Sequence, residues 1–211
     1  MRSVSYRDFL AVNRGGGLYS EAVSQRLGAL IASLGHRLGL SPAAISVGNV
    51  LIGLSASVLS GVIGWGSFAL VGWQLAYAFD CADGQLARVT GRASPAGARL
   101  DVLCDLVVQI SVVTAISAFC PSAPGWVLAL FAGTWLVNLV TSVLQSTYPL
   151  SLVPSAALPV RLVKLTRDYG FVILVAGLTL TLRPQWTFGL VLALTVLNGT
   201  FLFATLLRSP R

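Results

Sequence analysis

The sequence predicts an all-α integral membrane protein, with six transmembrane helices preceded by an N-terminal amphipathic helix at the membrane interface. Of the 211 residues, 55% are hydrophobic and only 10% are charged, against roughly 25% charged residues in soluble domains. The mean hydropathy is +0.82. Apolar stretches alternate with short turn signals, and a spanning helix needs about 20 apolar residues. A chain of this length therefore has room for about six spans and little else.

The first 40 residues are more polar than the rest and are expected to form a cytoplasmic segment. Apolar side chains recur at helical spacing in the second half of this segment, which predicts an amphipathic helix along the membrane surface. They are Val23, Leu27, Leu30, Ile31, Leu34 and Leu38. No apolar run of signal-peptide length occurs in residues 1–20, so no cleaved export signal is expected. The run from Arg14 to Gly17 lacks the Gly-Lys-Ser/Thr of a phosphate-binding loop and is interpreted as a linker.

Residues 41–211 are expected to form one six-helix membrane domain. Ser41 is a good N-cap and Pro42 suits a first helical turn, so the first span begins there and ends at about Ile63. Further apolar stretches occupy about 66–79, 100–120, 126–147, 169–182 and 186–207. Because the number of spans is even, both termini are expected on one side of the membrane.

The basic residues indicate which side of the membrane holds the two termini. With the N-terminus in the cytoplasm, every Lys and Arg except Arg183 falls in a segment predicted to be cytoplasmic, as the positive-inside rule requires. These segments would face anionic lipid, which explains the net charge of +7 without a nucleic-acid partner. We therefore expect a multi-pass protein of the cell (plasma) membrane of a bacterium, with a cytoplasmic active site.

Four of the seven acidic residues lie at or near the ends of two apolar stretches, where a buried carboxylate is costly unless a positive group compensates it. They are Asp80, Asp83, Asp101 and Asp105. Spacings of three and four place each pair on one face of its helix. Oxygen ligands favour Mg²⁺, Mn²⁺ or Ca²⁺ over zinc, and Mg²⁺ characteristically shares carboxylates with substrate phosphates. The pattern predicts metal-dependent phosphate chemistry.

The residues between these pairs suit a bound diphosphate. Gly84 lets a bulky group approach the backbone, Arg88 offers a planar guanidinium to phosphate oxygens, and Gly97 opens the next helix. The cysteines lack the spacing of a metal site and are interpreted as structural thiols. They are Cys81, Cys104 and Cys120.

Together these residues spell Asp80-x-x-Asp83-Gly84-x-x-Ala87-Arg88, then eight residues, then Gly97-x-x-x-Asp101-x-x-x-Asp105. This pattern resembles the signature of the CDP-alcohol phosphotransferase family (class I), and all eight signature positions are filled. Eight fixed identities match a given start by chance on the order of once in 10⁹. The six-helix architecture of that family, with the signature at the end of the second helix and the start of the third, agrees with the predicted spans.

The resemblance implies an enzyme of phospholipid biosynthesis that moves a substituted phosphate from a CDP-linked donor, expected to be CDP-diacylglycerol, to an alcohol, releasing CMP. It implies two divalent cations, Mg²⁺ or Mn²⁺, held by Asp80, Asp83, Asp101 and Asp105. Asp101 and Asp105 would be catalytic, with Asp105 as a further ligand or, as we expect, the general base. The resemblance also implies a homodimer within the membrane.

The same resemblance implies a donor site made of Gly84, Ala87, Arg88, Ser94 and Gly97. Ser94 would contact the phosphates, although an ordinary N-cap role is an equal alternative. Ala43 stands where relatives have Asn at the start of their first helix, so the segment from Ser41 to Ser46 is not expected to bind cytidine.

A basic helical face before the fifth span is the candidate acceptor site, for the phosphate of an acceptor such as glycerol or inositol phosphate. It comprises Arg161, Lys164 and Arg167. Contact with lipid headgroups is the alternative interpretation.

Alternative functions share parts of this pattern. The segment from Ser94 to Gly97 and the pair Cys104-Asp105 also resemble CDP-amino-alcohol phosphotransferases, which use diacylglycerol as the acceptor. Membrane prenyltransferases bind diphosphates through aspartates, but the Gly84, Ala87 and Arg88 insert argues against that class. A transport protein would show a repeated half, which the sequence lacks. A non-catalytic protein of the same topology would tolerate loss of a metal-binding aspartate.

Overall fold

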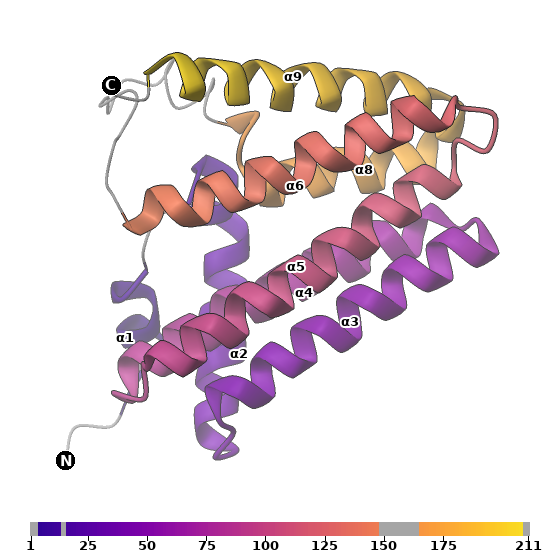
Figure 1. The fold of residues 1–211 in the computed structure, drawn as a ribbon. Helices are drawn as coiled ribbons and strands as arrows, with labels where there is room; N and C mark the ends of the chain where they lie inside the picture. Colours follow the sequence, from indigo (N-terminus) through magenta and orange to yellow (C-terminus); the bar gives the residue numbers. More distant parts are fainter. Residues whose placement is uncertain (1–3, 14–15, 148–164, 209–211) are drawn as a thin grey trace.

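A computed structural model gives the fold of residues 4–13, 16–147 and 165–208. Within these residues every regular element is a helix (Figure 1). The N-terminal elements are α1 (Tyr6–Ala11), the π-helical turn η1 (Ser20–Ser24) and α2 (Gln25–Arg37). The remaining elements are α3 (Pro42–Ile63), α4 (Gly66–Val89), α5 (Pro95–Ala118), α6 (Gly125–Thr147), α8 (Tyr169–Leu182), the 3₁₀ turn η2 (Pro184–Trp186) and α9 (Thr187–Arg208). A helix therefore lies at each apolar stretch of the sequence.

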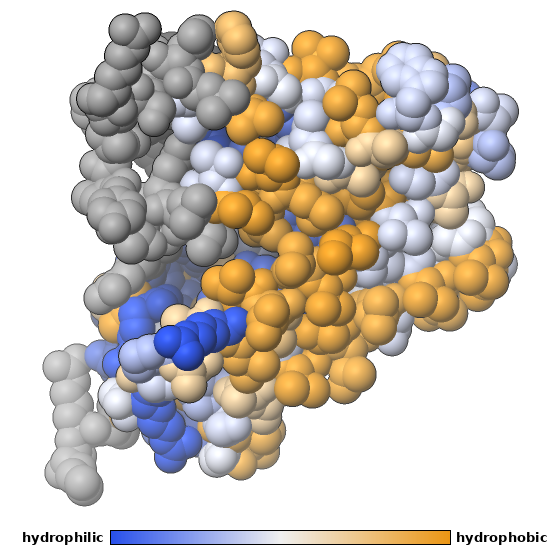
Figure 2. All heavy atoms as spheres, in the orientation of Figure 1, coloured by the Kyte–Doolittle hydropathy of each residue, from blue (hydrophilic) through white to orange (hydrophobic). Residues whose placement is uncertain are grey.

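Three segments of the described chain are long and apolar enough to cross a membrane. They are Pro42–Ile63, Pro95–Ala118 and Pro184–Thr205. Shorter apolar helices lie at Gly125–Thr141 and Tyr169–Leu182. Figure 2 shows a broad hydrophobic surface over the long helices, which carry many exposed apolar side chains. The described residues are therefore all-α, and their three long apolar helices suggest a membrane protein.

The cap predicted for the first long helix is present. The Ser41 Oγ accepts a 3.1 Å hydrogen bond from the Ala44 amide, and Pro42 occupies the first turn of α3. The helix ends at Gly64, whose φ of 77° is a left-handed conformation that favours glycine. This glycine lets α4 start immediately beside α3.

α4 packs tightly between α3 and α8 because small residues line both contacts. A Cβ added at Gly72 would lie 2.3 Å from the Cβ of Ala56 on α3. On the other side, a Cβ at Gly177 of α8 would lie 2.6 Å from the Cα of Leu70. Close approach at small residues is how apolar helices associate where no water is excluded. The packing fixes α4, which carries the first aspartate pair.

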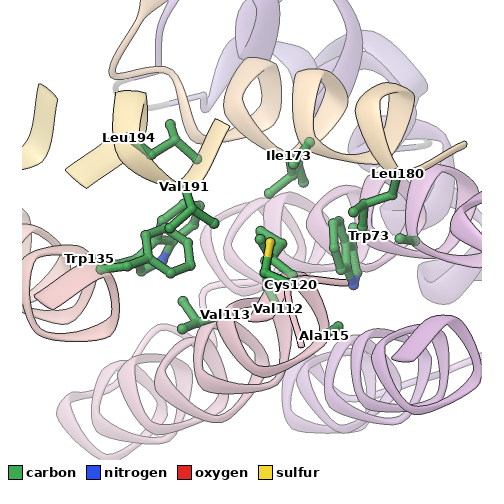
Figure 3. Close-up of a cluster of buried hydrophobic side chains, with 14 of the residues drawn as sticks. Trp73, Val112, Val113, Ala115, Cys120, Trp135, Ile173, Leu180, Val191 and Leu194 are labelled. Carbon is green, nitrogen blue, oxygen red and sulfur yellow. The ribbon is translucent and has the colours of Figure 1, made fainter. Parts of the chain in front are cut away.

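The largest cluster of buried apolar side chains lies among α4, α5, α6, α8 and α9. Figure 3 shows Trp73, Val112, Trp135 and Ile173 pointing into this cluster from four different helices. The Trp73 indole donates a 2.9 Å hydrogen bond to Ser57 on α3. Indole N–H groups in an apolar interior need such a partner. The cluster therefore ties the later helices to the pair that carries the site.

A helix, α2, occupies the segment predicted to be amphipathic, and it lies across the long helices at the end where α4 passes into α5 (Figure 1). Its bundle-facing side is made of small residues, and a Cβ at Gly28 would lie 2.8 Å from the Cβ of Cys81. The leucines of the predicted apolar face are exposed instead. They are Leu27, Leu30, Leu34 and Leu38. Figure 2 shows hydrophilic side chains gathered at this same end of the molecule.

Candidate metal centre

The two aspartate pairs meet near the end of α4 and the start of α5. Asp80, Asp83 and Asp101 each offer a carboxylate oxygen, and these oxygens all lie within 4.8 Å of one another. Asp105 lies beside Asp80, close enough for the two carboxyl groups to interact directly. Asp83 is only 4% exposed and the other three are half-buried. The four carboxylates therefore form one cluster.

The chemistry of this cluster fits a hard divalent cation. Several carboxylates held this close repel one another strongly in a poorly solvated place, and a cation removes that cost. All of the donors are oxygens, which suit Mg²⁺ and Mn²⁺. Cys81 and Cys104 lie close by on the same two helices and are free thiols, yet the group of possible ligands is made of aspartates alone.

A third helix contributes a residue that sequence reasoning did not assign to the site. Ser46 on α3 is 5% exposed, and its Oγ donates a 2.5 Å hydrogen bond to Oδ2 of Asp83. The hydroxyl fixes the orientation of that carboxylate from outside the cluster. The only available signal was its place, one helical turn after Pro42.

Arg88 lies directly over the backbone of Gly84. A Cβ added at Gly84 would lie 2.9 Å from Nη1 of Arg88, so glycine leaves room for the guanidinium. The Nε of Arg88 donates a 2.9 Å hydrogen bond to the carbonyl of Val12, just after α1. The space above Gly84 is thus occupied by the protein's own arginine, an arrangement that the sequence did not indicate.

Ser94 and Gly97 lie at the exposed start of α5. The Ser94 Oγ accepts a 3.1 Å hydrogen bond from the Gly97 amide, so Ser94 is the N-cap of this helix. The N-cap interpretation of Ser94 is therefore confirmed. Ala87 is half-buried on α4, one residue before Arg88.

A tyrosine pair that the sequence did not single out lies beside the carboxylates. Tyr169, the first residue of α8, is within electrostatic reach of Asp105 and Asp80. Its ring packs edge-on against Tyr77 of α4, with ring centroids 5.0 Å apart. The start of α8 therefore lies near the carboxylate cluster.

Of the candidate acceptor residues, Arg161 and Lys164 lie outside the described residues. Arg167 lies just before α8, and its Nη2 donates a 3.1 Å hydrogen bond to Asn138 on α6. Its guanidinium stacks over the Phe201 ring of α9 at 4.7 Å from the centroid. Burial lowers the pKa of this guanidinium. Arg167 thus presents a partly desolvated cation among three helices.

The chain was compared with known proteins. Residues 40–204 match the model of the family described as CDP-alcohol phosphatidyltransferase. The matched region runs from the start of α3 into α9 and contains every aspartate of the cluster. It leaves out α1, η1 and α2. No curated protein matches the chain.

Proposed function

Because the chain belongs to the CDP-alcohol phosphatidyltransferase family, we propose that it transfers a phosphatidyl group from CDP-diacylglycerol to an alcohol with release of CMP. Membership makes it a transferase of substituted phosphate groups that acts on a CDP-alcohol and an alcohol. The identity of the donor is the proposed part. The observation that supports metal-dependent phosphotransfer is the four-carboxylate cluster at the junction of α4 and α5.

We assign the four aspartates distinct roles. Asp80, Asp83 and Asp101 offer oxygens to a common centre, which suits them as metal ligands. Asp105 lies beside Asp80 and outside the group of three converging oxygens, which suits a ligand that also serves as the general base. Family members use divalent metal ions, and we propose two ions, Mg²⁺ or Mn²⁺, at this cluster.

The reaction can be written with the residues present. Asp105 takes the proton of the acceptor hydroxyl, and the hydroxyl oxygen attacks the β-phosphorus of the donor. The new phosphorus–oxygen bond forms as the bond from the β-phosphorus to the bridging oxygen breaks, and CMP leaves with that electron pair. Bound divalent cations neutralise charge on the diphosphate and on the attacking and leaving oxygens.

The donor site is proposed around the connection between α4 and α5. Arg88 presents a fixed guanidinium, held by Val12, that suits phosphate oxygens. The remaining proposed donor residues are Gly84, Ala87, Ser94 and Gly97. The acceptor phosphate is assigned to the basic group of Arg161, Lys164 and Arg167, of which Arg167 lies partly buried before α8.

We place the protein in the cell (plasma) membrane of a bacterium as six spans forming a homodimer, with the active site and both termini cytoplasmic. The exposed leucines of α2 and the hydrophilic side chains at the same end support an interfacial position for that helix. We therefore treat residues 1–40 as a cytoplasmic segment and residues 41–211 as the membrane domain.

The test is release of CMP by purified protein in lipid nanodiscs. The reactions would contain Mg²⁺ or Mn²⁺, either CDP-diacylglycerol or CDP-choline, and a panel of alcohols, with diacylglycerol as the acceptor for CDP-choline. We expect acceptor-dependent CMP from CDP-diacylglycerol, and none from Asp105→Asn protein. Release from CDP-choline alone would make the protein an amino-alcohol phosphotransferase. No release from folded protein with any pair would contradict the proposed activity.

A further inference from the structure

A buried carboxylate outside the signature joins two parts of the chain that are far apart in sequence. Asp168, immediately before α8, is 4% exposed. Its Oδ2 accepts a 2.9 Å hydrogen bond from the Ser20 amide, and its Oδ1 accepts a second hydrogen bond from the Ser20 hydroxyl. Burying a carboxylate costs solvation free energy, so the position of Asp168 must be compensated by its partners or by a function.

Asp168 caps a helix to which it does not belong. The chain becomes helical at Leu18, and the Glu21 amide donates to the Gly17 carbonyl at 2.9 Å. Gly17 therefore occupies the capping position without a capping side chain. A Cβ there would lie within 3 Å of the Asp168 side chain, so glycine makes room for the carboxylate of another element. The positive end of the helix offsets the buried charge.

Hydrogen bonds and close packing extend this contact to α4. The Ser20 hydroxyl lies 3.1 Å from the Tyr77 hydroxyl, and Tyr19 donates a 2.9 Å hydrogen bond to Gln74. Gln74 in turn donates to the Gly170 carbonyl at 2.9 Å. The start of α8, the η1 turn and the middle of α4 thus form one polar junction.

The other end of this N-terminal segment touches the signature itself. The Val12 carbonyl accepts the hydrogen bond from Arg88 Nε at 2.9 Å. The side-chain amide of Gln85, only 1% exposed, donates to Oδ1 of Asn13 at 2.5 Å and to the carbonyl of Gln25 at 3.0 Å. Residues 12–13 are therefore held at the arginine of the signature and residues 16–25 at Asp168, and Gln85 joins the two stretches by bonding Asn13 and Gln25. Both stretches lie outside the family match.

We propose that Asp168 is a positioning residue for the phosphotransfer: by holding Ser20, it keeps the Val12 carbonyl in place to orient the Arg88 guanidinium toward the donor diphosphate. The inference rests on the proposed function for the role of Arg88. It adds a residue outside the signature and gives residues 12–13 and 16–25 a part in donor binding. Asp168 contacts no substrate in this arrangement and acts only through the segment that it holds.

Three variants test the proposal in nanodiscs. Asp168→Ala removes both hydrogen bonds. Asp168→Asn keeps the shape and both contacts, because its oxygen accepts from the Ser20 amide while its NH₂ donates to the Ser20 hydroxyl. Ser111→Ala is the matched control, since it removes a buried 2.9 Å hydrogen bond to Ser57 between α3 and α5. Thermal unfolding of all three reports the general loss of stability.

The measurements are CDP binding in the presence of Mg²⁺, and the donor KM, acceptor KM and kcat of CMP release. Misorientation of one binding group predicts a donor KM and a CDP Kd raised about tenfold in Asp168→Ala, with kcat and acceptor KM within about threefold of the parent protein. In Asp168→Asn the donor KM and the CDP Kd should lie within about threefold of the parent values, and in Ser111→Ala both should be unchanged.

Two results would overturn the inference. One is unchanged CDP binding in Asp168→Ala. The other is an equal effect of Asp168→Ala and Ser111→Ala on the CDP Kd, both KM values and kcat, which would show that Asp168 has only a structural role. If the parent protein releases no CMP from any donor, the proposed function fails, while CDP binding by the same variants still decides the role of Asp168.

Discussion

The Ser46 hydroxyl on α3 donates a 2.5 Å hydrogen bond to Oδ2 of Asp83 on α4. This contact brings a third helix to a cluster whose carboxylates come from α4 and α5. Asp83 is 4% exposed, so little water is available to orient its carboxylate. The hydroxyl holds the Asp83 carboxylate in one orientation, as hydrogen bonds to ligating carboxylates do in metal sites.

Replacing Ser46 by Ala should therefore weaken metal binding while leaving all four carboxylates present. We expect the Mg²⁺ concentration for half-maximal CMP release to rise about 10- to 100-fold, the usual effect of losing such a partner. Ser46→Thr keeps the hydroxyl and is the control. Equal metal dependence of the Ala variant and the parent protein would show that Ser46 does not orient a ligand.

Removing the base should lower the rate of transfer more than it weakens metal binding. Asp105→Asn keeps an oxygen ligand but cannot accept the acceptor proton, so kcat should fall about 10²- to 10⁴-fold. Asp83→Asn should instead raise the metal requirement, because Asp83 belongs to the group with converging oxygens. Metal titrations of CMP release distinguish the two. A kcat for Asp105→Asn near that of the parent protein would exclude Asp105 as the base.

Gly84→Ala tests whether the Arg88 guanidinium needs the space above Gly84 to bind the donor. The new Cβ would lie 2.9 Å from Nη1 and 3.2 Å from Nη2 of Arg88, so the guanidinium must move. We expect donor KM to rise about tenfold with a smaller change in kcat, since misplacing a binding group mainly weakens binding. Gly133→Ala on α6, where nothing lies within 4 Å, is the control. Unchanged donor KM in Gly84→Ala would show that the arginine has room to adjust.

The sequence predicted what depends on local pattern. Apolar stretches and turn signals located the helices, and the capping roles of Ser41 and Ser94 could be read from single residues. The aspartate spacing predicted which carboxylates share a helix face, because helix geometry relates residues three and four apart. These features need no knowledge of how helices pack.

Contacts between distant segments could not be predicted in this way. Nothing in the sequence relates Ser46 to Asp83 or Ser20 to Asp168, because each pair meets only after helices pack. The reason for Gly84 was also missed, since a glycine looks the same whether it admits a ligand or a side chain of its own protein. α2 shows the same limit: its leucine spacing was visible, but the contact of Gly28 with α4 was not.

The close contact of Gly177 on α8 with α4 should contribute to the stability of the fold, because it sets how closely α8 packs beside the site. A Cβ at Gly177 would lie 2.6 Å from the Cα and 3.0 Å from the amide nitrogen of Leu70, and backbone atoms cannot move aside cheaply. Gly177→Ala should therefore destabilise the protein by about 1–3 kcal/mol, as overpacking does. It should also lower the midpoint of thermal unfolding in nanodiscs.

Gly199→Ala on α9 is the matched control, because nothing lies within 4 Å of its Cβ position. Alanine favours a helix over glycine by about 0.5–1 kcal/mol, so this variant should be neutral or slightly more stable. Opposite signs for the two substitutions would establish that helix contact, and not helix propensity, decides the effect at Gly177. An unfolding midpoint for Gly177→Ala at or above that of Gly199→Ala would contradict the close packing of α8 on α4.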